Sequence, residues 1–115
     1  MIAYSSIKIG DAAEDKARLF LESKGLITVR CNFKCKCGEI DLIMNDRGTL
    51  VFIEVRYRVS QEFGGAKESI TYSKRLKIER TAQFYLQAFK KIPPCRFDAV
   101  VIEGNHAPEW IQEAW

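Results

Sequence analysis

The segment from Leu50 to Arg58 contains the feature that most restricts the fold, which is the uninterrupted apolar run Leu50-Val51-Phe52-Ile53. Successive side chains of a strand point to opposite faces of a sheet, so this run is apolar on both faces. Such a strand is typical of the centre of a sheet that is covered on both sides by other layers. The chain therefore needs a sheet with a layer on each face.

The remaining periodicity supplies those layers. Residues 10–25 have apolar positions at helical spacing, with Asp11 as the expected N-cap. Residues 72–91 predict the longest helix, which Pro93-Pro94 would end. Strands are predicted at 27–35, 39–44, 50–58 and 96–103, and the tail 108–115 is expected to form a short helical turn. The order α-β-β-β-α-β predicts one α/β domain over residues 1–115, a central mixed β-sheet flanked by α-helices.

The charge distribution says more than the net charge of +3 over 115 residues. Residues 56–91 hold nine Lys or Arg against three Glu, a balance of +6, so the rest of the chain carries −3. A basic segment beside acidic residues suits a polyanionic ligand with a metal, although a solvated helix face would look the same.

Two further features of the sequence concern the protein's location in the cell. No apolar run approaches the ~20 residues of a membrane span. The first residues lack the apolar core of a signal peptide, so a cytoplasmic protein with reduced thiols and no membrane partner is expected. Cys31, Cys35 and Cys37 lack the paired spacing and fourth ligand of a zinc site, which favours free thiols.

Two carboxylates interrupt the apolar strands, Asp41 in 39–44 and Glu54 in 50–58. A carboxylate there is costly unless it is paired, and two on neighbouring strands repel unless a cation lies between them. A two-residue loop at Asp46-Arg47 would place Asp41 opposite Phe52. Asp41 and Glu54 would then be diagonal neighbours on one face.

This arrangement is suited to Mg²⁺, or Mn²⁺ in its place, which binds one or two carboxylates together with water and phosphate oxygens. Arg56, two residues after Glu54, would orient water and phosphate. The spacing is a loose pattern, and a structural alternative exists. Asp41 could accept backbone hydrogen bonds, and Glu54 could pair with Arg56 or Arg58.

At these residues the sequence resembles the YraN family of small bacterial proteins. That family is expected to have a restriction-endonuclease-like fold and similarity to archaeal Holliday junction resolvases. The match runs from Gly10 to the C-terminus. Its most specific parts are Gly38-Glu39-Ile40-Asp41-Leu42-Ile43 and Val51-Phe52-Ile53-Glu54-Val55. Further matching positions are Gly10, Glu14, Ala17, Gly25, Asn32 to Cys35, Phe63-Gly64, Ser69 to Thr71, Lys74, Ala82-Gln83, Tyr85-Leu86 and Arg96-Phe97-Asp98.

The resemblance implies roles for individual residues of a PD-(D/E)xK-like site. Asp41 and Glu54 would be the metal carboxylates, and Glu14 would approach the same metal from the first helix. Arg56 occupies the position of the superfamily's lysine. Arginine cannot act as a general base, because it does not lose its proton in proteins. Either the metal alone activates water, or Lys74 assists, or the protein binds nucleic acid without cutting it.

Three functions follow as hypotheses. The first is a Mg²⁺-dependent endonuclease acting on structured or branched DNA, and a homodimer would suit the cutting of two symmetric strands. The second is a non-catalytic module on the same fold that binds nucleic acid or a partner. The third is an interaction protein with structural carboxylates, which is disfavoured because Asp41 and Glu54 both occupy apolar strands beside the +6 segment. The expected phosphate contacts are Arg58, Lys67, Lys74, Arg75, Lys77 and Arg80.

Overall fold

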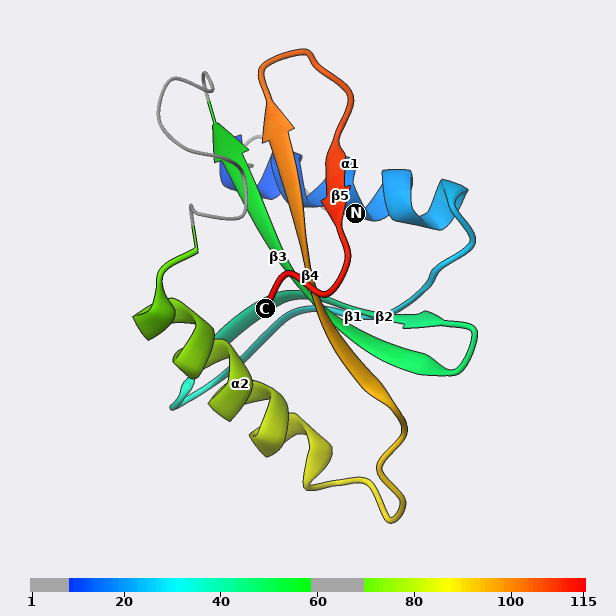
Figure 1. Cartoon of the computed structure of the whole chain (residues 1–115), viewed down its shortest axis with the longest axis vertical. Coiled ribbons are helices and arrows are strands. Elements are labelled where there is room, and N and C mark those ends of the chain that lie inside the picture. Colours follow the sequence, from blue (N-terminus) through cyan, green and yellow to red (C-terminus); the bar gives the residue numbers. More distant parts are fainter. Residues whose placement is uncertain (1–8, 59–69) are drawn as a thin grey trace, which may run out of the picture.

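The structure is a computed structural model that describes residues 9–58 and 70–115, with side chains described from residue 12 onward. Figure 1 shows a central sheet with α1 and α2 on opposite sides of it. The described part of the chain contains, in order, α1 (Ile9–Ser23), β1 (Ile27–Cys35), β2 (Gly38–Asp46), β3 (Thr49–Arg58), α2 (Tyr72–Leu86), β4 (Cys95–Glu103) and β5 (Glu109–Ile111).

The sheet is mixed, as the sequence predicted. Its strand order is β1-β2-β3-β4-β5, with β3 and β4 parallel and every other neighbouring pair antiparallel. The parallel pair requires a crossover, and α2 lies within that connection. None of the described helices is long and apolar enough to cross a membrane.

The central position of β3 follows from its two-sided apolarity. Val51 and Ile53 pack in the cluster beneath α1, whereas Leu50 and Phe52 pack in the cluster beneath α2. All four are at most 3% exposed. Glu54 shares the parity of Phe52, so the sheet's alternation directs its carboxylate to the α2 side.

The β2–β3 turn corrects the predicted register. The two-residue loop consists of Arg47 and Gly48, with φ of 52° and 95°, and Asp46 pairs with Thr49. Two successive positive φ values are the signature of a type I′ turn, whose twist matches that of the flanking strands. Leu42 therefore pairs with Ile53, a shift of two residues from the prediction. Because the shift is even, the predicted face of each side chain is retained.

The predicted bounds of both helices need correction. Helix α1 begins at Ile9, so Asp11 lies in its first turn and does not precede it. Helix α2 ends at Leu86, where Phe84 and Leu86 accept the turn hydrogen bonds of Gln87 and Phe89.

The tail is a strand where a helical turn was predicted, since Trp110 pairs with Val100 along the open edge of β4. The predicted connection 63–66, together with Lys67 and Ser69, lies outside the described residues.

Candidate functional site

A cavity of about 200 Å³ opens between the sheet and the first two turns of α2. The start of β2, the end of β3 and α2 each contribute to it. Its lining consists of Gly38, Glu39, Asp41, Glu54, Lys74, Lys77 and Ile78. Five of these seven positions hold an acidic or basic side chain, so the cavity is polar in spite of the apolar cluster beside it.

Asp41 and Glu54 are the buried acids of this cavity, only 8% and 4% exposed. The paired register of β2 and β3 ends at Leu42 and Ile53, and both acids lie one residue beyond it. There the Asp41 carboxylate accepts a hydrogen bond from the backbone N–H of Val55 at 2.8 Å. As the parity predicted, the two carboxylates from adjacent antiparallel strands line one cavity, and the catalytic roles assigned to them stay a prediction.

The negative charge of Glu54 opposes the ionisation of Asp41. Burial raises the pKa of Asp41 to about 9, and the negative charge of Glu54 adds to the shift. The N–H donated by Val55 acts in the other direction but is outweighed. In the absence of a cation, Asp41 therefore holds a proton at neutral pH. A bound metal cation would favour the ionised form of Asp41 beside Glu54.

Of the two cations paired with Glu54 in the described part of the chain, Lys74 is the nearer. Its Nζ lies 2.5 Å from Glu54 Oε2, whereas Arg56 Nη1 lies 3.7 Å from the same oxygen. The Thr71 side chain caps α2 by accepting the backbone N–H of Lys74, which fixes where the helix begins. Lys74 thus projects from the first turn of α2 into the cavity, twenty residues after its partner in the sequence.

Glu14 approaches from the other side of the sheet. It lies on α1, is half-buried, and its charge makes a small contribution to the raised pKa of Asp41. It is not among the residues that line the cavity, which opens on the α2 side. The structure therefore brings the charge of Glu14 near Asp41 but does not place it in the cavity with Asp41 and Glu54.

Comparison with known proteins matches residues 13–102 to the model of a family described as "Uncharacterised protein family UPF0102". The chain belongs to this family. The match confirms the resemblance to YraN proteins and spans the whole cavity together with Glu14.

Individual relatives match over most of their length. A UPF0102 protein of Nitrosomonas eutropha is 51% identical over 106 residues, which cover 92% of this chain and 91% of that protein. A UPF0102 protein of Neisseria meningitidis serogroup C is 49% identical, with 91% and 92% covered. One from Nitrosospira multiformis is 48% identical over 108 residues.

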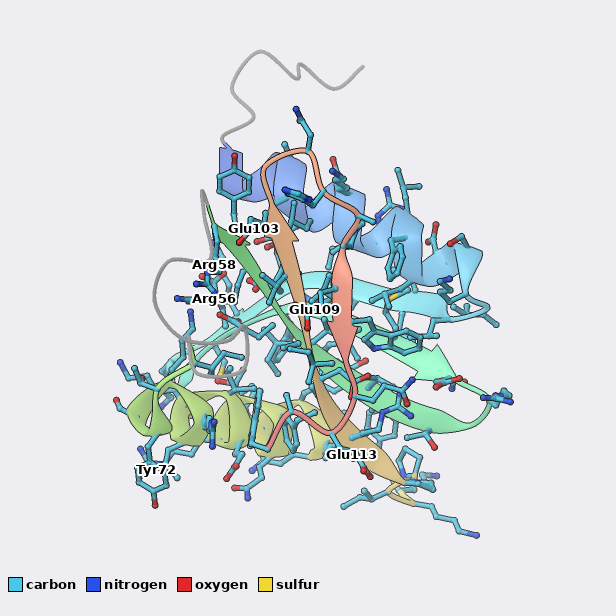
Figure 2. The ribbon with its side chains drawn as sticks, turned by 45° about the horizontal axis from the view of Figure 1, so that its top comes forward. Arg56, Arg58, Tyr72, Glu103, Glu109 and Glu113 are labelled. Carbon is cyan, nitrogen blue, oxygen red and sulfur yellow. The ribbon has the colours of Figure 1, made fainter. Side chains whose placement is uncertain are left out.

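The structure distributes the predicted phosphate contacts that it describes in this UPF0102 protein over several surfaces. Lys74 and Lys77 reach the cavity. Arg75 instead lies over the ring of Trp115, 5.9 Å from its centroid. Arg58 lies close to Arg56 at the end of β3, where Glu103 of β4 is its register partner (Figure 2). Arg80 is exposed on α2, and Lys67 lies outside the described residues.

Sequence reasoning missed two members of the cavity, Gly38 and Glu39. Gly38 has a φ of 150°, and a Cβ there would lie 3.1 Å from the Thr81 hydroxyl of α2. Glycine at this position allows β2 to approach α2 closely enough to close the cavity. The family motif beginning at Gly38 contained this signal, but only the packing shows what the glycine does.

A third buried acid, Asp98, is structural. It is fully buried and accepts hydrogen bonds from the Arg96 guanidinium, the Trp110 indole and the backbone N–H of Glu113. These donors use both carboxylate oxygens. Asp98 therefore joins β4 to β5 and has little capacity left for a ligand.

Proposed function

We propose that this protein is a Mg²⁺-dependent endonuclease acting on structured or branched DNA at the cavity between β2, β3 and α2. The observation that carries the proposal is the pair of buried carboxylates, Asp41 and Glu54, which face one cavity with Lys74 beside them. An apolar sheet tolerates such a pair poorly unless a cation joins it. The pair is therefore a functional-site candidate on physical grounds.

The donor set suits Mg²⁺ better than a softer metal. Within the described ranges, no three His, Cys, Asp or Glu side chains gather closely enough to hold a metal. Zinc normally takes three or four protein ligands, whereas Mg²⁺ keeps several waters and needs one or two carboxylates. When bound, Mg²⁺ would supply Lewis-acid activation of water and stabilise charge on the phosphate. Mn²⁺ has the same preference for oxygen ligands.

The chain's own residues then have separable roles. Asp41 and Glu54 would hold the metal, and Asp41 would give up its proton on metal binding. Lys74 would occupy the place of the superfamily's lysine, because it is nearer Glu54 than Arg56 is. A lysine ammonium can orient a water or lose a proton, whereas Arg56 can only stabilise negative charge on the phosphate.

The alternative is a non-catalytic DNA-binding module on the same fold. The close pairing of Lys74 with Glu54 favours it, because an internal cation already balances one of the two acids. In that case metal would bind weakly or not at all. A metal titration therefore separates the two functions.

Mg²⁺ or Mn²⁺ is expected to raise the melting temperature of the wild-type protein but not that of Asp41→Asn. A ligand held by the folded state alone stabilises it by about 2.7 kcal/mol at a hundred times its dissociation constant. The shift should grow as the pH is raised toward the pKa of Asp41, about 9, because the metal competes with a proton. Differential scanning fluorimetry over a metal and pH series measures it.

The matched control is Asp15→Asn, which removes an exposed carboxylate from α1 and should respond to metal as wild type does. A melting temperature that is independent of both metals at every pH would contradict the metal site. Cleavage of linear, flapped and four-way DNA, with and without Mn²⁺, tests the reaction itself. If no DNA form is cut or bound, the proposed function is wrong.

Lys74→Ala is expected to lower the cleavage rate by about 10²-fold, a loss typical of removing a group that moves or orients a proton. Lys77→Ala is the matched control, because Lys77 lines the same cavity from the next turn of α2. Rates at saturating DNA separate the chemical step from phosphate binding. Equal losses in the two variants would show that Lys74 contributes only its charge.

A further inference from the structure

A second hollow lies on the same side of the sheet, between β1 and the last turns of α2. Its volume is about 270 Å³, and its lining consists of Arg30, Phe33, Phe84, Tyr85, Ala88 and Phe89. Four of these six residues are aromatic, and the Arg30 guanidinium lies 5.0 Å from the centroid of the Phe33 ring. The hollow therefore combines ring surfaces with a cation at its rim.

Core packing explains only part of this cluster. Phe33 is buried and meets Tyr85 edge-on, with ring centroids 5.0 Å apart. Phe84 is different, since it is 43% exposed while its ring lies 6.3 Å from Phe33 at an interplanar angle of 35°. An exposed ring of this size contributes little to the stability of the fold. Its position at the hollow is available to a planar ligand.

Helix α2 connects this hollow to the carboxylate cavity. Lys77 lines the cavity and Phe84 lines the hollow. Seven residues make almost two turns, so the two side chains project from one face of α2, about 10.5 Å apart along its axis. Arg80 lies between them at helical spacing. The separation equals about three base steps of 3.4 Å.

The charge of the two elements that form the hollow selects its ligand. Strand β1 carries Arg30 and Lys34 with no acid, a balance of +2. Helix α2 carries four cations against Glu79, a balance of +3. Both β1 and α2 therefore favour a negatively charged ligand in the hollow. Exposed aromatic rings among cations are the usual binding surface for unpaired nucleotide bases.

We propose that the hollow formed by Arg30, Phe33, Phe84 and Tyr85 binds the unpaired bases of a single-stranded nucleic-acid segment adjoining the carboxylate cavity. The inference rests on the proposed nucleic-acid function and specifies its substrate class, a DNA with a single-stranded arm or flap. Phe84 supplies the stacking surface. Arg30, Lys77 and Arg80 contact the phosphates on the way to the cavity.

Phe84→Ala is expected to weaken binding of a fluorescent oligothymidylate by about tenfold, the scale of losing one stacked base. Binding of a blunt duplex of the same length should change by less than about twofold, since paired bases do not offer their faces. Fluorescence anisotropy in excess chelator measures both affinities and prevents cleavage. In a single strand that carries 2-aminopurine, the fluorescence should be quenched on binding to the wild-type protein but not on binding to Phe84→Ala.

Two further variants complete the test. Phe84→Tyr retains a ring and should bind the single strand as wild type does. Leu19→Ala removes another exposed apolar side chain, 57% exposed on α1, and should leave both affinities unchanged. If Phe84→Ala binds oligothymidylate with wild-type affinity, the hollow does not bind nucleotide bases. The same conclusion follows if the variant loses affinity for oligothymidylate and for the blunt duplex equally.

The readouts also separate this inference from the proposed function. A wild-type protein that responds to metal and cuts DNA, with Phe84→Ala unchanged on the single strand, would overturn the inference alone. A wild-type protein that binds neither DNA form would overturn both. Selective loss of single-strand binding without any metal response would support the hollow and leave the protein as a binding module.

Discussion

Asp41→Asn and Glu54→Gln are each expected to lower DNA cleavage by about 10³-fold or more while DNA affinity stays at the wild-type level or increases. Each change removes one of the two buried carboxylates that would hold Mg²⁺. The third acid that lines the cavity, Glu39, is exposed. The same negative charges repel phosphate, so their removal favours DNA binding. Initial rates and anisotropy on one branched substrate measure the two effects separately.

Glu39→Gln is the matched control for these variants. Glu39 lines the same cavity but is exposed, so its carboxylate is screened by water and should affect cleavage by only a few-fold. If Glu39→Gln lost as much activity as Asp41→Asn, the general acidity of the cavity would be responsible. The buried pair would then have no special role. Activity that survives in both Asp41→Asn and Glu54→Gln would place the reaction elsewhere.

The layered fold could be predicted because the signals for it are local. Alternation within each strand and helical spacing in α1 and α2 are properties of short segments, and β1 was predicted with its exact bounds. The two-sided apolarity of Leu50 to Ile53 required layers on both faces, and the structure has them. The shared face of Asp41 and Glu54 followed from parity, which an even shift of register does not change.

The two errors of register and tail had different causes, one a choice between local turns and the other contacts between distant residues. The sequence Asn45-Asp46-Arg47-Gly48 allows more than one two-residue loop. The observed turn places Arg47 at positive φ, with the Asn45 side chain accepting the N–H of Gly48 at 2.9 Å. The tail became a strand because the free edge of β4 and the Asp98 carboxylate provide its partners. A helical turn would have left Asp98 without Trp110.

The candidate site shows the same division between local and distant information. Asp41 and Glu54 were recognisable because acids are unusual in apolar strands. Lys74 was only one of several cations in a basic segment, and its distance from Glu54 depends on where Thr71 starts α2. Glu14 was expected to approach the same metal; its charge lies near Asp41, although Glu14 does not line the cavity, and its role stays a prediction. The hollow at Phe84 requires β1 and α2 to be side by side, which periodicity alone does not establish.

Asp98→Ala is expected to cost the fold about 3–5 kcal/mol, because it leaves a guanidinium with its main partner removed in a largely buried position. Arg96 donates to both Asp98 oxygens at 2.9 Å, and its side chain is only 16% exposed. Its remaining partner is Asp46, at 3.0 Å. Equilibrium unfolding in urea, followed by circular dichroism, measures the loss.

The tail should respond before the rest of the protein in this variant. Trp110 and the backbone of Glu113 lose their acceptor together, so β5 is expected to detach from β4 while the β1–β4 sheet remains. Both tryptophans lie in this segment, and their fluorescence should therefore change at lower urea than the circular dichroism does. Asp15→Ala removes an exposed carboxylate and should cost no more than about 0.5 kcal/mol. The fluorescence and circular dichroism transitions of Asp98→Ala could instead coincide, with a loss of unfolding free energy as small as that of Asp15→Ala. That result would show that Arg96 is adequately solvated without Asp98. The hydrogen bonds at Asp98 would then not be what holds the C-terminal strand.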